Sequence, residues 1–183
     1  MIFTHGPLPD VYVLRPERIE DHRGFFARTF CQHELAEHGL DIDIVQANVS
    51  GNRHRGTLRG MHYQAPPHQE TKIVRCSRGG IYDVIVDLRP DSATHGEWMG
   101  VELTAENGHI LYVPEGFAHG YITLTPDAEV SYFVSEAYAP DAECGVRYDD
   151  PFFGIEWPIS VEEISEKDAS WPNYRAQPTL SKV

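Results

Sequence analysis

The chain has 183 residues, 41% of them hydrophobic, which is enough for one sizeable core and too few to divide comfortably into two. Its formal net charge of -13 argues against nucleic acid as a partner, because the average surface would repel the phosphates. No stretch approaches the run of about 20 apolar residues that a membrane span needs. We therefore expect one soluble domain over residues 1–183, without export and without a membrane partner.

The cysteines add information about the cellular compartment. Cys31, Cys76 and Cys144 are an odd number of thiols at wide spacing. They form neither the close pairs of a zinc site nor the density of a disulfide scaffold. The simplest interpretation is three reduced thiols in a cytoplasmic protein.

Short segments rich in β-branched and aromatic residues follow one another along the chain, separated by turn residues at about the 8 to 12 residue spacing of sandwiches and barrels. The predicted strands are 11–14, 25–30, 44–50, 58–64, 72–77, 81–88, 98–103, 110–113, 121–124 and 130–135. Helices are predicted only for 32–38 and for the carboxyl-terminal tail, where Ser160 and Glu163 form a capping box before Ile164. The pattern predicts an all-β barrel or sandwich with short helices.

Two histidines occupy positions where a small barrel would line its interior. His62 lies in the predicted strand 58–64, three residues after Arg59, and His119 closes a turn that contains Pro114 and Gly116. Either imidazole alone is also compatible with a packed or hydrogen-bonded structural role. The pair makes a site for proton transfer near neutral pH a specific hypothesis.

A cationic cluster is embedded in this acidic chain. Arg53, His54, Arg55 and Arg59 fall within seven residues, and Lys72 follows. Guanidinium groups bind phosphate oxygens in pairs, so the cluster suits a small anionic ligand such as a diphosphate. The alternative is a solvated basic loop.

The segment 108–119 resembles the second motif of the cupins, in which a turn built on proline and glycine presents a histidine to the inside of a jelly-roll barrel. The first cupin motif would run from Gly56 to His62. Metal-binding cupins place a second histidine two residues after the first, where this chain has Gln64. Two imidazoles and an amide are a poor site for a tightly held divalent ion, so we expect neither metal nor cofactor.

The match is closer to one branch of the cupins. The chain resembles the dTDP-4-dehydrorhamnose 3,5-epimerase family, which acts on nucleotide-linked 4-keto-6-deoxy sugars. The motifs that carry the resemblance lie at 21–26, 58–64, Lys72, 83–89, His119, Tyr132, Tyr138, 149–151 and 165–168. They cover nearly the whole chain in the expected order, which makes the set far more specific than any one motif. The resemblance implies a jelly-roll fold and an isomerase.

The chemistry of such an isomerase defines the groups that it needs. A ketone at C4 acidifies the protons on C3 and C5, and inversion removes a proton from one face and returns one to the other. His62 is the candidate base, and the resemblance supplies Asp168 as its partner and Tyr132 as the proton donor. Lys72 is the candidate for stabilising the oxyanion that forms at O4. Tyr132 as a core aromatic and Lys72 as a phosphate ligand are the alternatives.

The resemblance also implies residues that bind the sugar nucleotide. They are Arg23, Gln46, Asn48, Arg59, His119, Tyr138, Glu143 and Lys167, with Arg23 and Arg59 as phosphate ligands. The chain departs from the family at Arg28, where many members carry an acidic residue. If that position meets the nucleotide, the preference for thymidine is open.

Two structural expectations follow. Regular alternation would send Arg59 and His62 to opposite faces of a strand, so we predict a bulge or kink at Gly60 that brings both to the same side. The resemblance further implies a homodimer, in which the amino-terminal strand of one subunit completes the sheet and the site of the other.

The activities left open are inversion at C3 only, at C5 only or at both carbons, on a sugar carried by thymidine or by a different base. A metal-dependent cupin enzyme and a non-catalytic sugar-nucleotide binder remain as further alternatives. The metal enzyme needs a third good ligand near His62 and His119, and the binder needs neither His62 nor Tyr132.

Overall fold

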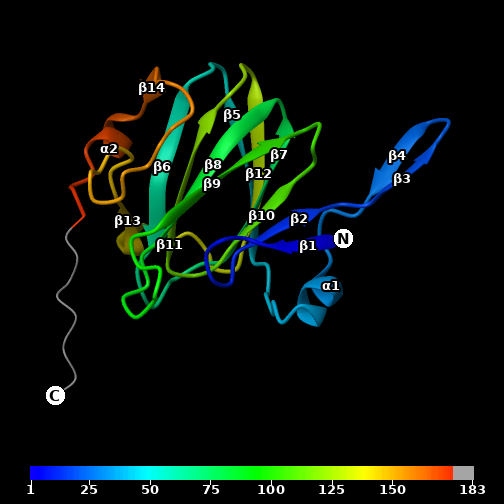
Figure 1. The fold of residues 1–183 in the computed structure, drawn as a ribbon, viewed down its shortest axis with the longest axis horizontal. Coiled ribbons are helices and arrows are strands. Elements are labelled where there is room, and N and C mark those ends of the chain that lie inside the picture. Colours follow the sequence, from blue (N-terminus) through cyan, green and yellow to red (C-terminus); the bar gives the residue numbers. More distant parts are fainter. Residues whose placement is uncertain (175–183) are drawn as a thin grey trace.

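Two β-sheets packed face to face form the body of the protein in the computed structural model, which describes residues 1–174 (Figure 1). The first sheet has the order β1 (Ile2–His5), β2 (Tyr12–Arg15), β10 (Ile110–Val113), β7 (Lys72–Arg78), β12 (Ala128–Val134) and β5 (Gln46–Asn52). The second has the order β13 (Glu143–Gly145), β6 (Thr57–Gln64), β11 (Phe117–Thr123), β8 (Gly80–Asp87) and β9 (Trp98–Thr104), and β14 (Glu163–Ile164) runs parallel to β6. The predicted all-β sandwich is confirmed.

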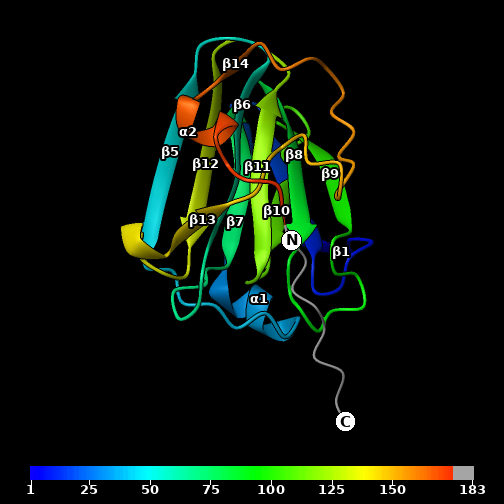
Figure 2. The ribbon, with the colours of Figure 1, turned by 90° about the vertical axis from the view of Figure 1, so that its left-hand side faces the viewer.

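A separate hairpin, β3 (Arg18–Asp21) and β4 (Gly24–Ala27), projects away from the two sheets (Figure 1). The helices are the short α1 (Gln32–Glu37), the 3-10 turn Pro140–Ala142 and the four-residue α2 (Glu166–Ala169). Figure 2 shows α2 and β14 beside β6, at the edge of the second sheet. Among residues 1–174, no helix is long and apolar enough to cross a membrane.

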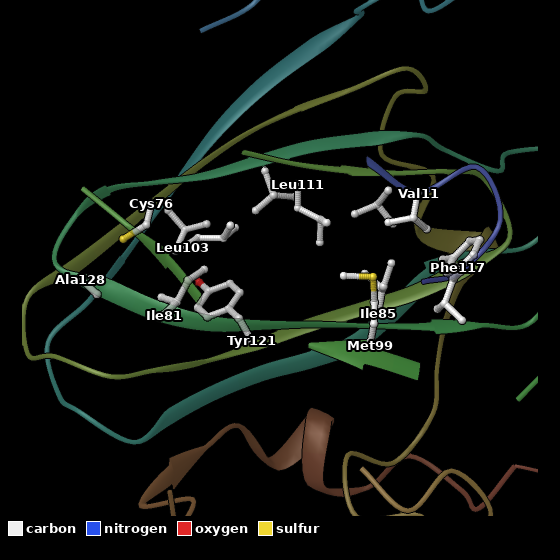
Figure 3. Packing of buried hydrophobic residues seen from close by; sticks show 14 residues of the cluster. Val11, Cys76, Ile81, Ile85, Met99, Leu103, Leu111, Phe117, Tyr121 and Ala128 are labelled. Atoms are coloured by element: carbon white, nitrogen blue, oxygen red, sulfur yellow. The ribbon is translucent and has the colours of Figure 1, made fainter. Parts of the chain in front are cut away.

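Apolar side chains from both sheets fill the space between them (Figure 3). Leu111 of the first sheet and Ile85 of the second are completely buried, and Met99 and Phe117 pack with them. In β8, Ile81 and Ile85 point to this core by strand alternation. Burial of the apolar faces at roughly 25 cal/mol per Å² is the main force that holds the two sheets together.

Two predictions about local structure need correction. The strand predicted for 25–30 ends at Ala27, because residues 28–30 leave the hairpin on the way to α1. The capping box of Ser160 and Glu163 is wrong. Glu163 lies in β14, and the helix begins after Ser165, whose hydroxyl accepts the backbone N–H of Asp168 at 3.0 Å. The cysteines are free thiols, as expected.

Asp87, at the end of β8, holds the loop that follows it. Its carboxylate accepts hydrogen bonds from the backbone and side chain of Arg89 and from the hydroxyls of Ser92 and Thr94. Burial alone would raise the pKa of Asp87, but these donors outweigh it and lower the pKa to about 2. The loop between β8 and β9 is therefore stabilised by an ionised carboxylate.

We predict that Asp87→Asn lowers the free energy of unfolding by roughly 2 kcal/mol near pH 7, because a depression of the pKa by one unit corresponds to about 1.4 kcal/mol. The ordinary pKa of this carboxyl is 3.8 and the folded value is about 2. Its contribution is therefore complete above the ordinary value and lost as the pH falls toward the folded value. Urea unfolding of both proteins near pH 7 and near pH 2 measures this; an equal difference at the two pH values contradicts the assignment.

Candidate active site

A cavity of about 550 Å³ opens between the two sheets beside α2. Its lining combines side chains from β5, β6, β7, β11, β12 and the segment that contains β14 and α2. The predicted site residues that line it are Arg59, His62, Lys72, His119, Tyr132 and Asp168. The structure thus brings together all four side chains assigned a catalytic role from the sequence, although they span more than a hundred positions.

An irregularity in the pairing of β6 with β11 lets Arg59 and His62 share this cavity. His119 lies opposite His62 and Tyr121 lies opposite Arg59, so β6 uses one residue more than β11 over the same distance. The predicted bulge at Gly60 is confirmed, and both side chains line the cavity. The extra residue resets the alternation of the strand.

Glycine is required at this bulge for two reasons. Gly60 has a φ of +128°, and a Cβ built on it would lie 2.6 Å from the Cα of Gly120 on the neighbouring strand. A Cβ on Gly120 would in turn lie 2.7 Å from the carbonyl oxygen of Arg59. The two backbones approach each other too closely for any side chain.

His62 is paired with Asp168. The Nε2–H of His62 donates to Oδ1 of Asp168 at 2.7 Å, and the backbone N–H of Gly60 donates to the other carboxylate oxygen at 3.2 Å. Burial raises the pKa of Asp168, but the hydrogen bonds from His62 and Gly60 outweigh it, so the pKa lies below its usual value. The ionised carboxylate holds the proton of the neutral imidazole on Nε2 and leaves the lone pair on Nδ1.

His119 has a carboxylate partner that the sequence analysis did not identify. Its Nε2–H donates to both carboxylate oxygens of Asp83, at 3.0 and 2.9 Å. Asp83 is fully buried, which raises its pKa, with His119 acting in the opposite direction. The sequence does indicate that Asp83 is buried. By strand alternation, Asp83 falls between Ile81 and Ile85 on the face of β8 that packs into the core. An acid at such a position needs a buried partner.

Tyr132 and Lys72 reach the cavity from the first sheet. Burial raises the pKa of the Tyr132 phenol, and the nearby Glu70 raises it further, while Arg59 acts in the opposite direction. The phenol therefore keeps its proton at neutral pH. Lys72 is 8% exposed and ion-paired with Glu70, and it still lines the cavity.

Of the other members of the basic cluster, all but Arg55 line the same cavity. Arg53 and His54 line it together with Arg59, whose Nε donates to Oδ1 of Asn52 at 2.7 Å. Asn52 is buried and donates in turn to the Tyr121 hydroxyl at 3.3 Å. This buried network fixes the direction of the Arg59 guanidinium, and sequence reasoning did not find it because Asn52 belongs to no recognisable motif.

Several predicted binding residues lie outside the cavity lining. Gln46 and Asn48 lie further along β5, joined by a 2.9 Å hydrogen bond, and Asn48 stands opposite Tyr132 in the strand register. A second group flanks α2: Glu143 accepts hydrogen bonds from the Tyr138 hydroxyl at 2.7 Å and from the Lys167 ammonium at 2.5 Å.

Arg23 does not line the cavity. It stands at the tip of the projecting hairpin with 78% of its side chain exposed, and its guanidinium binds Asp21. Arg28, the departure from the family pattern, lies beyond β4 and donates to Glu34 of α1 at 2.5 Å. One chain alone therefore does not bring the hairpin residues to the cavity.

Gln64 stands where metal-binding cupins have their second histidine, and in this protein its side chain has a structural role. Gln64 donates to the backbone carbonyls of His68 and Ala137 and accepts the N–H of Ala139, so its amide holds two loops. Within residues 1–174, no group of three His, Cys, Asp or Glu side chains is placed to hold a metal ion.

Comparison with known proteins agrees with this geometry. The sequence model of the dTDP-4-dehydrorhamnose 3,5-epimerase family matches residues 5–176. The chain belongs to this family. The dTDP-4-dehydrorhamnose 3,5-epimerase of Methanothermobacter thermautotrophicus is 42% identical over 96% of both chains.

Two solved structures are similar over nearly the whole chain. The Bacillus anthracis dTDP-4-dehydrorhamnose 3,5-epimerase, with TDP and PPi bound, is 40% identical with a TM-score of 0.92, covering 94% of this chain and 99% of its own. The 3'-monoepimerase of Streptomyces bikiniensis, in complex with dTDP-quinovose, is 35% identical with a TM-score of 0.85, covering 91% and 85%. Similar structures therefore include proteins that invert different sets of carbons.

We predict that Gly60→Ala costs at least about 2 kcal/mol more unfolding free energy than Gly24→Ala, because only the first adds overpacking to backbone strain. The two glycines have nearly the same φ, +128° and +130°, but a Cβ on Gly24 meets nothing within 4 Å. Gly24 is thus a matched control for the strain alone. Urea unfolding of the three proteins measures the difference, and equal losses would show that the approach to Gly120 does not matter.

Proposed function

We propose that the protein is a cofactor-independent epimerase of a nucleotide-linked 4-keto-6-deoxy hexose, with dTDP-4-dehydro-6-deoxy-glucose as substrate and dTDP-4-dehydrorhamnose as product. The observation that carries the proposal is the placement of His62, backed by an ionised carboxylate, in the same cavity as the protonated phenol of Tyr132. A base with a lone pair and an acid with a proton are the two groups that inversion of a carbon requires.

The steps follow from these groups. His62 removes the proton from C5 or C3, and the electron pair of the broken C–H bond moves into the ketone to give an enolate with its charge on O4. Lys72 stabilises that charge, since a fixed cation aimed at developing charge lowers the barrier. Tyr132 then donates its proton to the opposite face of the same carbon. Solvent takes the proton from His62 and returns one to the phenolate, so the enzyme is unchanged.

The cationic lining supports binding of the diphosphate. Arg59 is held by Asn52 at the cavity, and Arg53 adds a second guanidinium to the lining. Guanidinium groups bind phosphate oxygens in pairs, which fixes the orientation of the attached sugar. Tyr138 and Lys167 both bind Glu143, and this group beside the cavity contacts the nucleoside part of the substrate.

A homodimer explains the position of the hairpin. Ile19, Phe25 and Phe26 of β3 and β4 are each 59% exposed or more, and a two-stranded hairpin has little stability alone. β5 is an edge strand of the first sheet, and Val49 on its outer face is 65% exposed. We place the hairpin against the partner's β5, with Arg23 directed to the diphosphate in the partner's cavity.

The proposed chemistry predicts distinct isotope patterns for two variants. In deuterated water the wild type introduces deuterium at C3 and C5 of the 4-keto sugar. His62→Ala lowers exchange by at least about a hundredfold, because the base is gone. Tyr132→Phe keeps exchange on the face of His62 and loses net inversion, because only the return of a proton to the other face is blocked. Proton NMR of the sugar measures both.

Other outcomes assign the protein to an alternative. Exchange at one carbon only identifies a monoepimerase, and absence of exchange in the wild type identifies a sugar-nucleotide binder. Exchange that survives His62→Ala at the wild-type rate rules out His62 as the base. Exchange that is lost with a chelator and restored by a divalent ion indicates a metal-dependent enzyme.

The proposed dimer makes a prediction for mixed subunits. Arg23→Ala and His62→Ala are each expected to have low activity alone. In a mixed dimer, the cavity of the Arg23→Ala subunit contains its own His62 and receives Arg23 of the partner subunit, so one complete site forms. Unfolding and refolding the two variants together is expected to restore about a quarter of the wild-type sites if subunits pair at random.

A matched control separates this effect from nonspecific rescue. Arg59 and His62 lie on the same strand, so mixing Arg59→Ala with His62→Ala leaves every site with one residue missing. That mixture is expected to stay inactive. Equal recovery in both mixtures, or recovery in neither, contradicts the completion of the site by the partner's hairpin.

A further inference from the structure

Trp171, just beyond α2, occupies a slot that exists because residue 145 is glycine. Gly145 lies in β13 directly opposite His62 of β6. A Cβ added to Gly145 would lie 2.2 Å from Cε2 of Trp171, so the indole rests on the backbone where any other residue would have a side chain. The slot therefore fixes the indole beside the strand that carries His62.

From this slot, the indole contacts groups on two sides. Its ring lies edge-on to the imidazole of His62, with centroids 6.4 Å apart and planes at 70°. The Lys167 ammonium lies 5.8 Å from the indole centroid. The buried Nε1–H has no hydrogen-bond partner among residues 1–174. The indole is thus held by its shape and its ring contacts, and it does not line the cavity.

Asp168 depends on such anchors because its helix is too short to be stable alone. α2 has four residues, whereas isolated helices shorter than about 12 to 15 residues are marginal in water. Ser165 caps its first turn, and Arg147 donates to the carbonyl of Ala169 at 3.1 Å. Lys167 of the helix also binds Glu143 of β13. The seated indole of Trp171 is a further anchor, immediately after the helix and on the side of His62.

We propose that Trp171 is a positioning residue that, by filling the slot over Gly145, holds Asp168 against His62 and so keeps His62 oriented for proton abstraction. The inference rests on the proposed role of His62 as the base. Loss of the indole would free the end of α2 and open one side of the imidazole to water. Small displacements of a catalytic group have large effects, since a shift of about 1 Å can lower a rate about a hundredfold.

The electrostatic surroundings of His62 are set by several elements, and all are present in the variants proposed below. Asp168 binds the imidazole, Glu143 of β13 acts on it electrostatically, and Lys167 of α2 pairs with Glu143. The other charged and titratable groups in the lining that His62 shares are Arg53, His54, Arg59, Lys72, His119, Tyr132 and Glu163. Among them, only Asp168 makes a hydrogen bond to the imidazole within residues 1–174. Removal of Trp171 therefore acts on a histidine whose direct hydrogen-bond partner is Asp168.

The test compares Trp171→Ala and Trp171→Phe with the wild type. We expect Trp171→Ala to lower kcat by about 10- to 100-fold with little change in KM, because the indole touches the base and not the substrate cavity. The pH profile of kcat should shift, because the contact between His62 and the Asp168 carboxylate is loosened and one side of the imidazole opens to water. Trp171→Phe should stay within about threefold of the wild type, because no hydrogen bond of the indole is lost.

Two further variants separate positioning from general stability. Gly145→Ala displaces the indole without removing it and should reproduce the kinetic effect of Trp171→Ala, while adding little in the Trp171→Ala background. Trp98→Phe, on β9 of the same sheet, changes a half-buried tryptophan away from His62 and should leave the profile unchanged. A lower Tm with an unchanged pH profile in Trp171→Ala would overturn the proposal.

An NMR measurement that does not depend on catalytic turnover tests the role of Trp171 separately from the proposed epimerase activity. The ring signals of His62, assigned with His62→Ala, can be titrated by NMR in the full-length protein. Trp171→Ala is expected to shift that titration whether or not the wild type turns over a 4-keto sugar. An inactive wild type with a shifted titration contradicts the proposed function alone, and an unshifted titration contradicts the role of Trp171.

Discussion

The extra residue in β6 at Gly60 is the constraint on which the rest of the site depends. Without it, Arg59 and His62 would face opposite sides of the strand, and the proposed phosphate ligand and the proposed base would not share a cavity. The bulge is possible because Gly60 and Gly120 let two backbones approach each other where a side chain would collide. Gly60 also donates its backbone N–H to Asp168, so the bulge helps to place the hydrogen-bond partner of His62.

The cavity gathers positively charged side chains although the chain as a whole is acidic. The net charge is -13, yet the cavity gathers Arg53, Arg59 and Lys72. His62 and His119 each bind a carboxylate, but the two carboxylates have different electrostatic environments. Asp168 has a lowered pKa and keeps its charge next to His62, whereas burial raises the pKa of Asp83 next to His119. A local field, and not the average charge, suits the cavity to an anionic sugar nucleotide.

The sequence predicted most of the fold because alternating apolar residues and turns act locally. It predicted the bulge at Gly60 because the proposed site needs Arg59 and His62 on the same face of the strand. It did not place Asp83 beside His119, since that contact joins two strands whose register no local pattern specifies. The cap of α2 was misassigned because two serines precede acids at similar spacing, and only the pairing of β14 with β6 decides between them. The roles given to Arg23 and its hairpin depend on a second chain.

A crystal structure of the protein with a bound nucleotide-linked 4-keto sugar, or a stable analogue of it, tests the central claim most directly. The account predicts that the sugar ring lies in the cavity with the imidazole of His62 on one face and the hydroxyl of Tyr132 on the other, each about 3 to 3.5 Å from C3 or C5. It also predicts that Arg59 contacts the diphosphate. A sugar bound outside this cavity, or one with both groups on the same face of its ring, would contradict the account.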